Sequence, residues 1–162
     1  MKADEVVSLL VERGQTVATA ESLTGGLVCA ELTSIPGASA CVRGGLVSYA
    51  VAVKADVLGV DADLLERQGA VDPAVAVHMA LGARRLLAAD YAVATTGSAG
   101  PDPDPGGVVA GPVPPGQGYV AVVGPEGEVV VGFACAGQDR EGVRRHAVSA
   151  ALDLLGRVLT GA

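Results

Sequence analysis

Aromatic residues are nearly absent from this chain. Its 162 residues include no Trp, one Phe and three Tyr, although half of all residues are hydrophobic. The core must therefore be built from Val, Leu and Ala, and small side chains of this kind suit layered α/β packing. The length fits a single core, so we expect residues 1–162 to form one domain.

Long apolar runs are absent as well. No stretch reaches the ~18–20 apolar residues that a membrane-spanning helix needs, so we expect no membrane partner. The first residues, MKADEVVSLLVERG, form an amphipathic pattern with charges inside it. They show neither the uncharged apolar segment nor the cleavage site of a signal peptide. These observations predict a cytoplasmic protein.

Cysteine and histidine are too few and too scattered to define a metal site or a disulfide framework. The three cysteines, Cys29, Cys41 and Cys135, are widely separated and form no C-x-x-C pair. The two histidines, His78 and His146, stand far apart without metal-ligand spacing. We therefore expect no metal and interpret the cysteines as small buried thiols.

Positive charge is in short supply. Eleven Lys and Arg residues face eighteen Asp and Glu residues, which gives a net charge of −7. A general nucleic-acid partner is therefore not expected, because such proteins present a basic surface with stacking aromatics. A small anionic ligand held by a few local cations remains compatible with this balance. The high apolar content predicts a homo-oligomer that buries part of its surface between subunits.

Helical and strand-like segments alternate along the chain. The patterns predict helices over 2–13, 25–34, 51–58, 61–68, 73–88 and 139–159, and strands over 15–20, 41–50, 91–96, 118–123 and 128–135. Because the last two strands form a hairpin, we expect an α/β fold: a three-layer α/β/α sandwich with a mixed, mostly parallel sheet. Residues 102–116 are rich in Pro and Gly, which predicts a functional loop without a helix or central strand.

Two glycine-rich turns each follow a predicted strand. The first, AESLTGG at 20–26, turns into a helix, whose first amides have no partner within the helix and favour a phosphate or an oxyanion. A hydroxyl placed among them is a candidate nucleophile. The alternative is that Ser22 or Thr24 only caps the helix. The second turn is GSAGP at 97–101.

Six segments together resemble one known family. They are AESLTGG at 20–26, SIPGAS at 34–39, GGLVSYAVAVKADVLGV at 44–60, QGAV at 68–71, TTGSAGP at 95–101 and DREGVRRHAV at 139–148. Their order and spacing resemble the CinA C-terminal domain family, whose members act as nicotinamide mononucleotide amidohydrolases of the PncC type. The resemblance implies conversion of nicotinamide mononucleotide, as the small-molecule partner, to nicotinate mononucleotide and ammonia in pyridine-nucleotide salvage. It implies no metal and no organic cofactor.

The resemblance also implies roles for particular residues. Ser22 is the nucleophile, Lys54 the base, and Tyr49 a group that orients the lysine or relays a proton. The implied substrate-binding residues are Thr24, Gly25, Gly26, Thr96, Gly97, Ser98, Ala99, Gly100, Arg140 and Arg144. One glycine-rich turn is expected to hold the oxyanion and the other the ribose phosphate, and the sequence leaves the assignment open. Lys54 must be neutral to act, so its pKa must fall, through burial or through a neighbouring cation such as Arg140.

Structural interpretations stand beside these roles. Lys54 is by type an exposed lysine, Tyr49 a core or edge aromatic, and Arg140 and Arg144 surface charges on one helix face. Residues 102–118 also lack the family's usual K-P-V-G-T-like segment before the next strand. This departure motivates an alternative: a catalytically silent nucleotide-binding or regulatory module. A third hypothesis is hydrolysis of another small amide or nucleotide.

Overall fold

The computed structural model describes residues 1–161, so residue 162 of the expected domain lies outside the described residues. In chain order the elements are α1 (Ala3–Glu12), β1 (Val17–Glu21), α2 (Leu27–Thr33), the 3₁₀ turn η1 (Ala38–Ala40), β2 (Val42–Val47), α3 (Val51–Asp56), α4 (Ala62–Gln68), α5 (Pro73–Leu86), β3 (Tyr91–Gly97), β4 (Asp104–Gly107), β5 (Gly111–Val113), β6 (Gln117–Gly124), β7 (Gly127–Ala134) and α6 (Arg140–Thr160).

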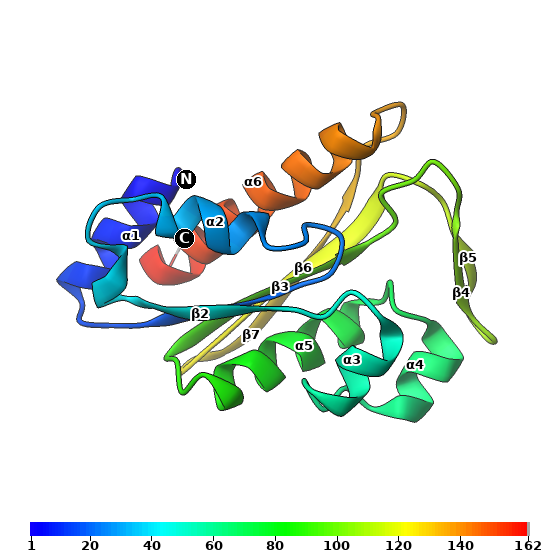
Figure 1. Cartoon of the computed structure of the whole chain (residues 1–162), viewed down its shortest axis with the longest axis horizontal. Helices are drawn as coiled ribbons and strands as arrows, with labels where there is room; N and C mark the ends of the chain where they lie inside the picture. The colour runs from blue at the N-terminus through cyan, green and yellow to red at the C-terminus, as the bar shows by residue number, and fades with distance from the viewer. Residues whose placement is uncertain (162) are drawn as a thin grey trace.

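Five strands form the main sheet in the order β2-β1-β3-β6-β7 (Figure 1). β1 pairs in parallel with both β2 and β3, whereas β6 runs antiparallel to β3 and to β7. Four strands therefore point the same way, and β6 runs against them. The expected mixed, mostly parallel sheet is confirmed, and the β6–β7 hairpin is the reason it is mixed.

Helices cover both faces of the sheet, which gives the three layers expected from the sequence. α1, α2 and α6 lie on one face, and α5 lies on the other with α3 and α4 beside it (Figure 1). Alternate residues of a strand point to opposite faces, so Val17 packs toward α1 and α6 while Ala18 and Ala20 pack toward α5. α5 begins at Pro73 and is capped by Asp72, as its sequence predicts.

The glycine pair of β2 marks an irregular edge strand. The register of β1 and β2 shifts by one residue, so that Val17 pairs with Val42 and Ala18 with Gly44. Gly45 lies so close to Thr19 that a Cβ atom there would overlap its hydroxyl oxygen. Both a bulge and a close backbone approach are therefore present, as the glycine pair predicted.

The segment 102–116 is not an irregular loop throughout. β4 and β5 pair into a short antiparallel ribbon that is separate from the main sheet. The expectation of a loop is wrong for β4 and β5, although neither is a central strand: prolines exclude a segment from a central strand but permit an isolated two-stranded ribbon. The ribbon is anchored on α4: the backbone amides of Val108 and Val109 donate to the carbonyls of Glu66 and Arg67.

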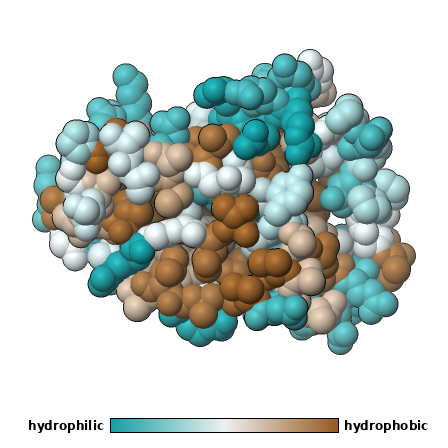
Figure 2. Space-filling model, viewed as in Figure 1, coloured by the Kyte–Doolittle hydropathy of each residue, from teal (hydrophilic) through white to brown (hydrophobic). Residues whose placement is uncertain are grey.

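Apolar side chains also reach the surface. Figure 2 shows an apolar patch across the middle and lower part of the molecule, where Figure 1 shows β2 and α5. The exposed large hydrophobic residues include Val47, Val57 and Leu86. Within residues 1–161 we find no helix whose length and hydrophobicity would let it cross a bilayer.

Candidate active site

The three parallel strands β2, β1 and β3 end at the same edge of the sheet. Ser22 follows β1 directly, Ser48 and Tyr49 follow β2, and the second glycine-rich turn follows β3. Backbone hydrogen bonds hold these ends together: the amide of Ser22 donates to Thr95 at 3.0 Å and that of Ser48 to Glu21 at 2.9 Å. Ligands of open α/β sheets commonly bind outside the carboxyl ends of the strands.

Ser22 and Lys54 meet at this edge. The Nζ atom of Lys54 lies 3.0 Å from the Oγ atom of Ser22 and donates to the carbonyls of Ser48 at 2.7 Å and Tyr49 at 3.2 Å. A neutral amine has two N–H groups and one lone pair. The two carbonyls can take the N–H groups and leave the lone pair for the Ser22 hydroxyl, which is the geometry of an activated nucleophile. The exposed-lysine interpretation is wrong, since Lys54 is only 1% exposed.

Burial also changes the protonation of this lysine. Loss of hydration lowers the pKa of Lys54 from 10.5 to about 8, while the nearby Asp104 carboxylate opposes the change. At pH 7 about a tenth of the amine is then neutral, against well under a thousandth for an unperturbed lysine. Burial alone accounts for the direction, so the expectation that Arg140 is the cation that lowers this pKa is not supported.

Tyr49 and Arg140 form a pair across the mouth of the site. Arg140 donates to the Tyr49 hydroxyl at 2.9 Å and to the carbonyl of Gly100 at 2.7 Å. The Tyr49 side chain is 60% exposed, and it is its backbone carbonyl that contacts Lys54. The tyrosine hydroxyl thus accepts a hydrogen bond from Arg140 in this structure, and Tyr49 orients Lys54 through its backbone carbonyl.

The first glycine-rich turn holds an internal carboxylate that the sequence reasoning missed. Glu21, only 1% exposed, accepts the backbone amides of Gly26, Val28 and Cys29 at 2.8–3.0 Å. It also accepts the hydroxyl of Thr24 at 2.7 Å. The amides at the start of α2 are therefore occupied.

That contact corrects the capping interpretation of this turn, while the substrate-binding role expected of its residues stays a prediction. Neither Ser22 nor Thr24 caps α2, because Gly26 is the cap residue and Glu21 supplies the acceptor. Thr24, Gly25 and Gly26 do not line the cleft. The signal that would have revealed this was the acidic residue just before the turn, which is well placed to reach helix amides.

Arg144 and Thr96 also point away from the cleft. Arg144 donates to the carbonyls of Leu23 at 3.0 Å and Thr24 at 3.1 Å, so its guanidinium holds the first turn. Thr96 is buried, and its hydroxyl donates to the carbonyl of Ala70. Neither residue lines the cleft, and the substrate-binding role expected for each stays a prediction.

A cleft of about 270 Å³ contains the Ser22–Lys54 pair. Its lining joins the second glycine-rich turn to the start of the ribbon, and comprises Ser22, Leu23, Tyr49, Val51, Lys54, Ala70, Gly97, Ser98, Ala99, Gly100, Asp102, Pro103, Asp104, Pro105 and Arg140. The ribbon segment thus contributes two carboxylates, Asp102 and Asp104, that no sequence motif predicted. Across residues 1–161 no group of three or more His, Cys, Asp or Glu residues is arranged to hold a metal ion.

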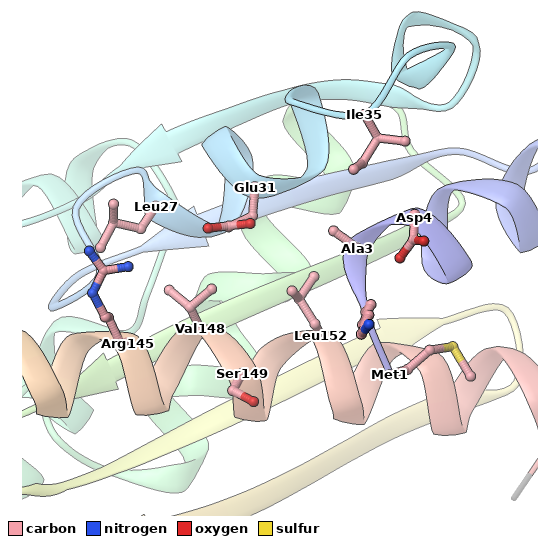
Figure 3. Close-up of a pocket in the computed structure, with 11 residues that line it drawn as sticks. Met1, Ala3, Asp4, Leu27, Glu31, Ile35, Arg145, Val148, Ser149 and Leu152 are labelled. Carbon is pink, nitrogen blue, oxygen red and sulfur yellow. The ribbon is translucent and has the colours of Figure 1, made fainter.

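A second and larger hollow lies between α1, α2 and α6 (Figure 3). It measures about 410 Å³, and Leu27, Ile35, Val148 and Leu152 line it. Every polar residue that lines it is exposed, so it offers no desolvated nucleophile or base. Chemistry rather than size therefore selects the Ser22 cleft as the candidate active site.

Comparison with known proteins places this chain and its α/β fold in one family. The sequence profile of the CinA C-terminal domain matches residues 1–159. The chain belongs to the CinA C-terminal domain family. It is 48% identical over 156 residues to a CinA-like protein of Frankia casuarinae, and 46% identical over 159 residues to one of Thermosynechococcus vestitus.

Solved structures agree with this placement. A CinA superfamily protein of Klebsiella pneumoniae superposes with a TM-score of 0.89 at 32% identity, over 99% of this chain and 96% of that protein. A competence/damage inducible protein of Agrobacterium tumefaciens gives 0.84 at 36% identity, over 98% and 95%. The alignments with the Frankia and Thermosynechococcus proteins cover 96% and 97% of this chain but only 34% and 37% of theirs, so the chain spans about a third of these longer relatives.

Proposed function

We propose that this protein is a nicotinamide-nucleotide amidohydrolase that converts nicotinamide mononucleotide to nicotinate mononucleotide and ammonia. The observation that carries the proposal is the 3.0 Å contact between Ser22 and the buried amine of Lys54. Serine activated by a neutral lysine suits hydrolysis of an unreactive carboxamide, and family membership supports the substrate.

The reaction follows from this pair. Attack forms the bond between Oγ of Ser22 and the carboxamide carbon, moves the carbonyl π electrons onto oxygen, and passes the hydroxyl proton to Lys54. Collapse breaks the C–N bond while Lys54 returns the proton, so ammonia leaves. Water then hydrolyses the acyl-serine ester with Lys54 as base. One water is consumed, and the products are a carboxylate and ammonia.

The charges around the cleft fit a substrate that carries both signs. Nicotinamide mononucleotide joins a cationic pyridinium ring to an anionic phosphate. Arg140 at the mouth is the available phosphate partner, because its guanidinium forms charge-assisted hydrogen bonds. Asp102 and Asp104 line the same cleft and complement a cationic ring. The ribbon therefore supports binding of this substrate class although it departs from the family's usual sequence.

Ammonia release from nicotinamide mononucleotide tests the proposal. We expect turnover by the purified protein and none above background by Ser22→Ala, which should still bind the substrate in calorimetry. Ser149→Ala serves as the control, because that exposed serine lines the other hollow. Binding without ammonia release by the unaltered protein would favour the silent nucleotide-binding module. Release only from other compounds in a panel of amides would favour the third hypothesis.

The assembly of the protein stays a prediction. The expected homo-oligomer is testable by light scattering, which gives the molar mass in solution independently of shape. A mass of about 16.0 kDa would indicate a single chain and contradict the expectation. The expected cytoplasmic location likewise stays a prediction, which fractionation of cells expressing the protein measures.

A further inference from the structure

Four backbone amides beside Ser22 have no acceptor. Among residues 1–161, no oxygen accepts the N–H groups of Leu23, Thr24, Ala99 or Gly100 within hydrogen-bonding geometry. More than nine in ten buried backbone N–H groups are paired in native proteins. Leu23 is 3% and Ala99 is 7% exposed, so these two amides belong to buried residues, and both residues line the cleft.

Leu23 and Ala99 are also neighbours, although they follow different strands. Their side chains belong to one small apolar cluster with Cys135, Val143 and Ala147. Leu23 follows the nucleophile directly, and Ala99 lies in the turn after the neighbouring strand β3. Two residues from separate strand ends therefore bring unpaired N–H groups to the cleft that contains Ser22.

The backbone amides at the start of α2 are excluded as an alternative site for the oxyanion. Glu21 occupies the amides of Gly26, Val28 and Cys29, and a second negative charge beside this carboxylate would be repelled. An oxyanion formed at Ser22 consequently finds its donors outside the helix terminus.

We propose that the N–H groups of Leu23 and Ala99 form the oxyanion hole, an assignment that rests on the proposed amide hydrolysis. When Ser22 attacks, the carbonyl oxygen gains the electron pair of the broken π bond and becomes the oxyanion. Donors preorganised toward that oxygen stabilise the tetrahedral state more than the planar carboxamide, so they raise kcat rather than tighten substrate binding. The phosphate is then left to Arg140 at the mouth of the cleft.

Amide-to-ester replacement tests each donor singly, because it removes an N–H group and keeps the side chain. We expect Leu23→leucic acid and Ala99→lactic acid, introduced by translation with acylated suppressor tRNA, each to lower kcat by roughly 10²–10³-fold with KM little changed. The matched control replaces Tyr91, at the start of β3 and outside the cleft lining, by its hydroxy-acid analogue, since its N–H donates to the carbonyl of Thr16 at 2.9 Å. This control should lower Tm yet keep kcat within a few-fold. Leu23 and Ala99 esters that retain kcat would overturn the assignment.

A boronic acid separates this assignment from the choice of substrate. Pyridine-3-boronic acid places boron where nicotinamide has its carboxamide carbon; the Ser22 oxygen bonds to boron, and the hydroxyl proton passes to Lys54. We expect the amide protons of Leu23 and Ala99 to move downfield in ¹⁵N-labelled protein while that of Tyr91 stays in place, with no change in Ser22→Ala. An adduct that leaves both amides unmoved overturns the oxyanion hole. An adduct with the expected shifts but no ammonia from nicotinamide mononucleotide overturns the substrate only. No adduct and no ammonia release would overturn both.

Discussion

The two glycine-rich turns look alike in sequence and differ in the folded protein. The turn at Thr24–Gly26 leads into α2, and Glu21 occupies the first amides of that helix. The turn at Gly97–Gly100 leads into the ribbon segment, and its Ala99 and Gly100 amides find no acceptor within residues 1–161. Glu21 therefore closes the helix amides of the first turn to an anion, while the N–H group of Leu23 in that turn and those of Ala99 and Gly100 in the second stay unpaired among the described residues.

The difference assigns separate tasks to the two turns. In the first turn, Glu21 accepts the Thr24 hydroxyl and Arg144 donates to the carbonyls of Leu23 and Thr24. These contacts hold Ser22 in place. The second turn lines the cleft with all of its residues and carries the unpaired amides of Ala99 and Gly100, to which the first turn adds that of Leu23. A rigidly held nucleophile and unpaired donors beside it are what a preorganised site requires.

Replacing Lys54 should give the largest effect, because it removes the base that contacts Ser22 in the first turn. We expect Lys54→Met to lower kcat by roughly 10²–10⁴-fold in the ammonia assay. The same change should raise Tm at pH 7, since a buried ammonium is costly. Lys2→Met is the control, because Lys2 is the only other lysine and is exposed.

The pH dependence of that Tm difference sharpens the test. The folded-state pKa of Lys54 is about 8 and its ordinary value is 10.5, so between these values the unfolded chain binds more protons. The stability of the unaltered protein therefore rises with pH through this window, and the advantage of Lys54→Met should shrink there. An advantage that stays constant from pH 7 to 10.5 would contradict a lowered pKa.

Glu21→Gln tests the carboxylate that accepts the backbone amides at the start of α2. An amide nitrogen in place of one carboxylate oxygen faces helix N–H donors, so we expect a loss of about 2–3 kcal/mol in the free energy of unfolding. The kcat should also fall, because Ser22 follows this residue directly. Glu31→Gln changes an exposed glutamate of the same helix and is the control. Equal free energies of unfolding in urea for Glu21→Gln and Glu31→Gln would contradict the claim that Glu21 stabilises the first turn.

Alanine variants of Arg140 and Arg144 should separate substrate binding from positioning of the first turn. Arg140→Ala removes the proposed phosphate partner beside the second turn, so KM for nicotinamide mononucleotide should rise about tenfold or more with kcat less affected. Arg144→Ala releases the carbonyls of Leu23 and Thr24, so kcat should fall while KM changes little. Arg145→Ala, an exposed neighbour that pairs with Glu141, should leave both constants unchanged. The same kinetic change in Arg140→Ala and Arg144→Ala would show that the two turns are not functionally distinct.

Asp104→Asn should have the smallest effect on kcat, seen in its pH profile, while KM for the cationic ring should rise. The Asp104 carboxylate raises the pKa of Lys54, so its removal should lower that pKa further below about 8. Because Lys54 acts when neutral, the rising limb of kcat against pH should move to lower pH, and kcat at pH 7 should increase. Asp102→Asn is the control within the same cleft. A limb that moves to higher pH would contradict the inferred interaction.

Much of the fold was predictable because it depends on local patterns. The buried runs of β1 and β3 and the apolar stripe of α6 each specify an element by periodicity. The β4–β5 ribbon was not predictable, because its short strands, rich in Pro and Gly, are stabilised by contacts with α4 rather than by their own pattern.

The candidate site divides in the same way. The residue types at 22, 49, 54 and 140, and the resemblance of their motifs to one family, were legible in the chain itself. Only the tertiary structure decided that Lys54 is buried against Ser22 and that Glu21 accepts the first amides of α2. It also decided that the amides of Ala99 and Gly100 are left without an acceptor within residues 1–161. The physical reason is that burial, pairing and pKa depend on neighbours brought together from distant positions, whereas composition and periodicity describe only the residues adjacent along the chain.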